Sequence, residues 1–132
     1  HVGLPRLDDF CWIAKQEKNV YAGLAVASAF IATRPRYFAE IMANLLYWVG
    51  EDKILFGSDY AIWTPKWIVE AFARFELPED IKQEYGVDLT PQAKRKILGE
   101  NAARLYGIDI EAQKAKLAKD PIGQQLAARQ AA

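Results

Sequence analysis

The sequence has little of what crosslinks a protein or anchors it in a membrane. Among its 132 residues there is a single cysteine, Cys11, so no internal disulfide can form. A reducing, cytoplasmic compartment is therefore expected. The most apolar stretches, 22–32 and 41–49, are shorter than the roughly 20 residues that a membrane-spanning helix needs. No signal peptide is visible either, and we expect no association with a membrane.

An excess of charge of one sign is also missing, because 17 basic and 17 acidic residues cancel. A nucleic acid or an acidic partner is therefore not expected. Several catalytic signatures are absent as well: the sequence has no His-Glu-x-x-His motif, no Cys-x-x-Cys pair, no phosphate-binding loop and no nucleophile elbow. Any functional signal must come from less familiar patterns.

What the sequence does have is a large apolar fraction, 52%, which suffices for the core of a single domain. Helix-like and strand-like segments alternate along it. The expected elements are a helix over 7–18, a strand over 20–25, a helix from 33–35 to 49, a strand over 53–57 and a helix over 64–75. This alternation predicts an α/β fold with parallel strands and crossover helices. The same alternation predicts a further strand that ends just before His1. Two or three parallel strands cannot close a barrel.

Shorter helices are expected in the remainder of the chain. They run over 79–85, from Thr90-Pro91 to 98, and from a capping Asn101 to 106. The segment 109–132 is rich in Ala, Gln and Lys and is interrupted at Asp120-Pro121. We expect it to be a separate tail, either a helix that is exposed or bound to a partner, or a disordered segment.

The strongest local signal for function is Ile54-Leu55-Phe56-Gly57-Ser58-Asp59-Tyr60, an apolar strand followed by an aspartate. Active sites of parallel α/β proteins lie at the carboxyl ends of their strands. A carboxylate at that position can bind a divalent ion or accept a proton from metal-bound water. Alternatively, Asp59 caps a turn before the helix that begins at Thr64. The spacing of the residues does not choose between these roles.

A second candidate is His1, in the segment His1-Val2-Gly3-Leu4-Pro5 just before the first expected helix. A histidine at a strand end suits metal binding or proton transfer, whereas a lone terminal histidine is often incidental. Cys11 and Trp12 lie within an amphipathic helix, and both are expected to serve packing.

Four ordered blocks carry a family resemblance: His1-x-Gly3-x-Pro5, residues 19–24, residues 50–60 and residues 96–107. Together they resemble the second family of amidohydrolases, the relatives of aminocarboxymuconate-semialdehyde decarboxylase. The resemblance covers about residues 1–108. It implies that this stretch is the C-terminal part of a TIM-like (β/α)₈ barrel, about strands six to eight with their helices.

The resemblance also implies roles for individual residues. His1 aligns with the histidine after strand six, which orients or activates the attacking water. Asp59 aligns with the strand-eight aspartate, a metal ligand and general base. The ion would be Zn²⁺, with Mn²⁺ as the alternative. Tyr60 and Trp63 would contact the substrate, and Phe30 would line the mouth of the site.

The family's other ligands are a His-x-His pair on strand one and a histidine on strand five. The present chain has one histidine only, so the chain alone is expected to be inactive. Joined to the remainder of its own barrel, it would act on a small-molecule substrate as a metal-dependent hydrolase or non-oxidative decarboxylase.

An alternative function is that of a non-catalytic accessory or assembly subunit in a larger complex. Amidohydrolase-like proteins occur beside bacterial multicomponent oxygenases, and a tail rich in Ala and Gln suits docking. A homo-oligomer is compatible with either function. A self-standing α/β binding module is disfavoured, because its sheet would keep open edges.

Overall fold

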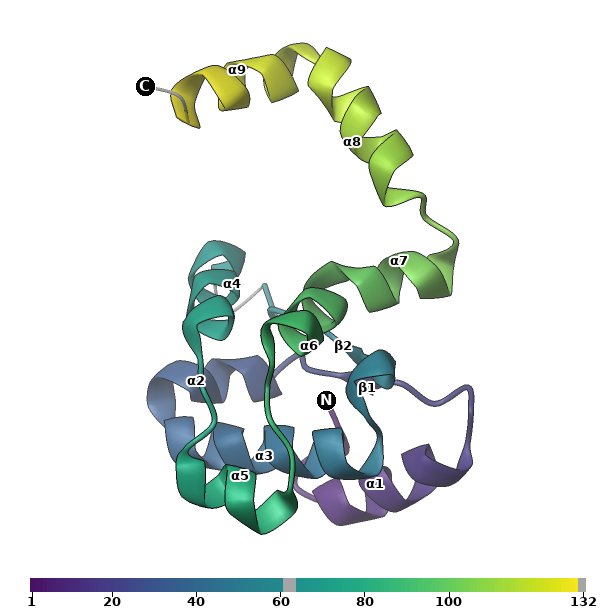
Figure 1. Cartoon of the computed structure of the whole chain (residues 1–132), viewed down its shortest axis with the longest axis vertical. Helices are drawn as coiled ribbons and strands as arrows, with labels where there is room; N and C mark the ends of the chain where they lie inside the picture. Colours follow the sequence, from purple (N-terminus) through teal and green to yellow (C-terminus); the bar gives the residue numbers. More distant parts are fainter. Residues whose placement is uncertain (61–63, 131–132) are drawn as a thin grey trace. The chain divides into compact units, whose positions relative to one another are not determined.

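The computed structural model describes residues 1–60 and 64–130. The chain divides into two compact units, His1–Asn101 and Ala102–Ala132. The first unit holds a two-stranded parallel sheet surrounded by helices (Figure 1). Its α/β character agrees with the prediction from the alternating pattern. The (β/α)₈ barrel of which it was predicted to be a part stays a prediction.

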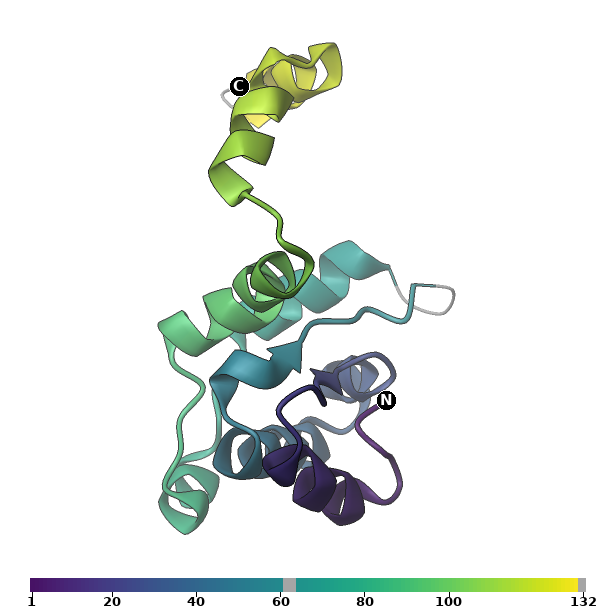
Figure 2. The same ribbon diagram turned by 90° about the vertical axis from the view of Figure 1, so that its right-hand side faces the viewer.

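Both strands are short. β1 (Ala22–Gly23) and β2 (Ile54–Leu55) pair in parallel, residue against residue. The Leu24 amide extends the pairing by donating to the Leu55 carbonyl over 2.9 Å. Figure 2 shows the two strands side by side within this unit. The two predicted strands are therefore confirmed in position and direction, but only their central residues pair.

The longer helices lie close to their predicted positions: α1 (Leu7–Gln16), α3 (Pro35–Trp48), α4 (Pro65–Arg74) and α5 (Glu79–Tyr85). Proline begins α3 and α4, where its missing N–H costs nothing. Gly50 follows α3 with a φ of 80°, and Gly86 follows α5 with a φ of 64°. Gly86 has the left-handed conformation that typically ends a helix, whereas Gly50, with a ψ of 159°, is extended with a positive φ that favours glycine.

Two short helices between β1 and α3 were not predicted. They are η1 (Ala27–Ala29) and α2 (Phe30–Thr33), which follow each other directly. The buried Ser28 hydroxyl donates to the Leu24 carbonyl over 3.0 Å, so it ties this segment to the end of β1. Each of these helices is about one turn long and has no capping residue. Such a segment is too short to show the helical spacing of apolar residues from which a helix is predicted.

The prediction that Asn101 caps a helix is wrong. The chain passes through α6 (Pro91–Arg95) and the π-helical turn η3 (Lys96–Glu100), and Asn101 then has helical backbone angles of φ −65° and ψ −45°. Its fully buried side chain turns to the segment before β2, which includes η2 (Glu51–Lys53). The Asn101 amide donates to the Glu51 carbonyl over 2.7 Å and to the Ile54 carbonyl over 2.8 Å.

Lysine side chains make similar ties around the start of β2. Lys96 pairs with the carboxylates of Glu51 at 2.6 Å and Asp52 at 2.9 Å. Hydrogen bonds to these two carboxylates raise the pKa of Lys96 above its usual value. Lys53 donates to the Ala14 and Glu17 carbonyls, the latter over 2.8 Å, and so holds the end of α1. The Lys53 contacts satisfy carbonyls that the end of α1 leaves without partners.

Aromatic rings join α3 and α4 to the segment that leaves β2. Phe38 meets Phe72 edge-on at 6.3 Å and Phe75 at 5.0 Å between ring centres. Phe56, directly after β2, meets Phe72 at 6.2 Å. Phe38 and Phe72 are fully buried. Edge-to-face pairs of this kind add about 0.5–1.5 kcal/mol each beyond the burial of their surface.

The second unit is helical, and its last two helices are almost entirely exposed. It contains all of α7 (Asn101–Tyr106) except Asn101, together with α8 (Ile110–Lys119) and α9 (Pro121–Gln130). The predicted interruption at Asp120-Pro121 is confirmed, since Asp120 ends α8 and its carboxylate accepts the Ile122 amide over 2.8 Å. Of the two alternatives for the tail, the structure shows helix. No helix in the described part of the chain is long and apolar enough to cross a membrane.

The Asn101 contacts predict a large loss of stability for Asn101→Ala. The substitution leaves two backbone carbonyls near β2 without their donor, so the free energy of unfolding should fall by about 2–4 kcal/mol. Urea unfolding measures this change. Asn44→Ala is the matched control: Asn44 donates to the Tyr85 hydroxyl and is only partly buried, so its loss should be about 1 kcal/mol. Equal losses for the two variants would contradict the assigned role of Asn101.

Candidate functional site

The carboxyl edge of the sheet is where the chain leaves β1 and β2. The two departing segments touch there, because a Cβ atom added to Gly57 would lie 2.8 Å from the Ala25 nitrogen and 3.1 Å from its Cα. No side chain fits at position 57 without moving this backbone. The Phe56 amide, one residue earlier, donates to the Ile97 carbonyl over 3.0 Å. The segment after β2 is therefore held from both sides.

Strained backbone angles occur in the segments that follow the strands. Three non-glycine residues in the described ranges have positive φ: Val2 at 48°, Val26 at 63° and Asp59 at 55°. Val26 and Asp59 each lie three or four residues beyond a strand, and Val2 directly follows His1. Such angles are costly for side chains with a Cβ, above all for β-branched valine. Strain of this kind is concentrated at active and binding sites.

Asp59, the predicted metal-site carboxylate, is half-buried at this edge. Its left-handed backbone turns the chain sharply after Ser58. Helix α4 begins at Pro65 after Thr64, whose side chain makes no capping hydrogen bond. The role of Asp59 as a metal ligand and general base stays a prediction, and so does the alternative that it caps a turn.

The predicted substrate-contacting residues have different positions. Tyr60 follows Asp59 directly and is 75% exposed. Trp63 lies outside the described residues. Phe30, which was predicted to line the mouth of the site, is half-buried and meets the Tyr37 ring edge-on at 5.0 Å. Tyr60 is thus exposed, whereas Phe30 packs against α3, and the substrate contacts predicted for Tyr60 and Trp63 stay predictions.

His1 is exposed at the start of a tight turn. Its carbonyl accepts the Leu4 amide over 3.1 Å, and the Val2 side chain beside it is buried. Gly3 has a φ of 70°, and a Cβ there would lie 2.6 Å from the Cβ of Phe10. The glycine of His1-x-Gly3-x-Pro5 thus allows the turn to press on α1. The role of Gly3 is therefore steric. The catalytic role of His1 stays a prediction.

No group of three or more His, Cys, Asp or Glu side chains in the part of the chain that the structure describes could hold a metal ion. A catalytic zinc ion normally has three protein ligands. His1 and Asp59 therefore do not complete a metal site from this chain.

Cys11 is buried on α1, as the prediction of a packing role requires. Burial, with a smaller effect of the nearby Asp8, raises the pKa of its thiol to about 11. A raised pKa disfavours the thiolate, which is the reactive form of cysteine, and so agrees with a packing role. Trp12 departs from the prediction, because it is 61% exposed.

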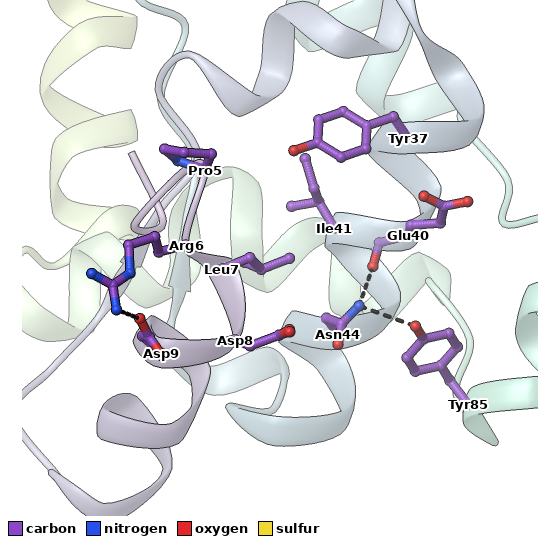
Figure 3. A pocket seen from close by; sticks show the side chains of 10 residues that line it. All are labelled: Pro5, Arg6, Leu7, Asp8, Asp9, Tyr37, Glu40, Ile41, Asn44 and Tyr85. Carbon is purple, nitrogen blue, oxygen red and sulfur yellow. Dashed lines mark hydrogen bonds and ion pairs between the residues drawn. The ribbon is translucent and has the colours of Figure 1, made fainter.

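A cavity of about 660 Å³, which sequence reasoning missed, opens between α1 and α3 (Figure 3). Its lining includes Asp8 of α1, Asn44 of α3 and Tyr85 of α5. Asn44 donates to the Tyr85 hydroxyl over 3.1 Å and to the Glu40 carbonyl over 3.0 Å. None of the predicted site residues lines this cavity. The only hint in the sequence is the helical spacing of residues 37, 41 and 44 on α3.

A comparison with protein families relates most of the chain to a known family. A family model described as Amidohydrolase matches residues 1–108. No curated protein and no solved structure matches the chain. The matched residues span the first unit, with β1, β2 and both strand exits, and end just after α7.

The two glycines near the strand exits offer a matched pair of substitutions. Gly57→Ala forces a Cβ against the Ala25 backbone, so the free energy of unfolding should fall by about 1–3 kcal/mol. Gly23→Ala in β1 meets no atom within 4 Å, so it should change this free energy by less than about 0.5 kcal/mol. Chemical denaturation of both variants measures the difference. Similar values for the two would show that the strand exits do not press together.

Proposed function

The chain belongs to the amidohydrolase family, and from this membership we propose that it forms the C-terminal part of a (β/α)₈ barrel enzyme. That enzyme hydrolyses or non-oxidatively decarboxylates a small molecule with the help of a divalent metal ion. Two parallel strands with crossover helices are the local architecture of such a barrel. The similarity of its sequence blocks to aminocarboxymuconate-semialdehyde decarboxylase and its relatives supports the choice of these two reaction types.

The single observation that carries this proposal is the geometry of Asp59. The residue lies at the carboxyl edge of a parallel sheet, on a backbone with a φ of 55°, within a segment that Gly57 holds against Ala25. A barrel places its catalytic groups at this edge. A fold accepts backbone strain on a non-glycine residue where the position of its side chain matters.

In the proposed reaction Asp59 contributes a carboxylate that accepts a proton at the reacting centre. His1, in the turn that precedes α1, moves a second proton. Tyr60 and Trp63 bind the substrate beside Asp59. Exposure of the Tyr60 ring is compatible with this role.

The metal ion needs ligands that the described residues do not provide. We therefore propose that Asp59 is one ligand, and that histidines outside this chain complete the set. The ion would be Zn²⁺, with Mn²⁺ as the alternative, and would polarise the substrate or a bound water molecule. Everything that this chain contributes to the chemistry then depends on the position of one carboxylate and one imidazole.

A second candidate function rests on the tail. Helices α8 and α9 expose Leu117, Ile122 and Leu126, with 60%, 68% and 53% of their surfaces accessible. Apolar side chains on exposed helices suit docking to another protein. In this alternative the barrel is an accessory or assembly subunit of a larger complex, such as a multicomponent oxygenase, and performs no chemistry.

The enzyme proposal predicts that Asp59→Asn in the complete protein abolishes turnover while the protein stays folded. The substitution keeps the shape of the side chain and removes its charge and its ability to accept a proton. Activity is measured on a panel of small carboxylic acids, lactones and amides, by carbon dioxide release and by acid release. Asp88→Asn is the matched control, because Asp88 is exposed between α5 and α6, away from both strands in the sequence, and should leave turnover unchanged. Wild-type turnover in Asp59→Asn would contradict the catalytic role proposed for Asp59.

Metal analysis of the same complete protein separates the two candidate functions. The enzyme should retain about one divalent ion per chain after gentle purification, and less than about 0.1 ion in Asp59→Asn. A wild-type protein with no bound ion and no turnover on the panel would favour the accessory role.

A further inference from the structure

The chain leaves β1 through a tight turn centred on Val26. This residue has a φ of 63° and a ψ of −52°, and the Ala27 amide donates to the Ala25 carbonyl over 2.7 Å. Such angles, with a hydrogen bond that spans a single residue, define the strained and rare form of the γ-turn. A positive φ is least favourable for a β-branched side chain. Glycine would make the same turn without strain, so the turn itself does not explain a valine.

Contacts on both sides of Val26 keep the turn in place. The Ser28 amide and hydroxyl both donate to the Leu24 carbonyl, over 2.8 and 3.0 Å. Ala27 and Ser28 are fully buried. A strained angle persists only where the surrounding structure imposes it, and these contacts do so. Val26 is half-buried, so its side chain stays partly accessible while the two residues that follow it are enclosed.

The turn lies beside the segment that carries Asp59. The register of the two strands continues to Ala25 and Gly57, whose backbones are in contact. One residue further, it places Val26 opposite Ser58, directly before Asp59. Neighbouring strands lie about 4.8 Å apart. The strained valine and the strained aspartate therefore lie on adjacent segments of the same carboxyl edge.

We infer that Val26 is a specificity-determining residue of the proposed enzyme, and that its isopropyl group limits the size of an apolar substituent next to the reacting carbon of the substrate. The inference rests on the proposed function, in which Asp59 marks the reacting centre. Ligand sites combine apolar walls with a few polar groups that fix orientation. A valine side chain is stiff, because branching at Cβ restricts its rotamers, and so it forms a rigid wall.

The neighbouring groups define the class of substrate. Its polar end meets the carboxylate of Asp59 and the proposed metal ion, and its adjacent carbon faces the hydrocarbon of Val26. A carboxylic acid, lactone or amide that carries an alkyl or aryl substituent on the carbon next to its carbonyl group has this arrangement.

Two substitutions of opposite size test the inference in the complete protein. Val26→Gly removes the isopropyl group, and Val26→Ile adds one methylene group and keeps the branch at Cβ. The assay measures kcat/KM for acids, lactones and amides whose substituent grows from methyl to phenyl. One methylene group in an apolar pocket changes kcat/KM by about tenfold or more. Val26→Gly should therefore raise the preference for phenyl over methyl compounds at least about tenfold, and Val26→Ile should lower it by a similar factor.

Val49→Gly is the matched control, because Val49 is also half-buried but has an ordinary φ of −101° at the end of α3. This variant should lower the midpoint of urea unfolding and leave the size preference unchanged. Val26→Gly should keep the wild-type midpoint or raise it, since the relief of backbone strain offsets the lost side-chain contacts. A lower midpoint for Val26→Gly together with an unchanged size preference would show that the valine only packs.

The same assay separates this inference from the function on which it rests. Asp59→Asn, measured on the same compounds, reports on the proposed function alone. An active wild type whose Val26 variants keep its size preference would overturn the inference and leave the proposed function in place. A wild type without turnover on the whole series would overturn the proposed function and the substrate contact with it.

Discussion

The close approach of the Gly57 and Ala25 backbones decides where the two strand exits lie. A side chain at position 57 would strike the Ala25 nitrogen and Cα, so only glycine lets the exits meet at one edge. Two residues later the chain turns sharply through Asp59 with a positive φ. The carboxylate that the proposed chemistry needs is thus positioned by backbone contact and backbone strain together.

The other end of β2 is held by polar contacts with the helix that follows later in the chain. The Asn101 amide satisfies the carbonyls of Glu51 and Ile54, and Lys96 pairs with two carboxylates in the same turn. A two-stranded sheet has little hydrogen bonding of its own, and such buried or half-buried ties compensate for that. They keep β2 in register, so the geometry at its carboxyl end depends on residues far from the candidate site.

The candidate site and the contacts that stabilise β2 lie at opposite ends of this strand. Asp59 follows the carboxyl end of β2, and the Asn101 and Lys96 contacts lie at its start. In barrel proteins, residues at the carboxyl ends of the strands carry the chemistry, and residues at the opposite end serve stability.

The sequence by itself determined the parallel α/β pattern, the main helices and the position of Asp59 just beyond a strand, because periodicity and capping residues are local signals. It also pointed to the amidohydrolase family, which the match over residues 1–108 now shows. Only the tertiary structure decided that Asn101 ties β2 instead of capping a helix and that Trp12 lies exposed beside Trp48. It alone revealed that Gly57 presses on Ala25. These features join residues 30 to 50 positions apart, and no local pattern specifies which distant group a side chain will meet.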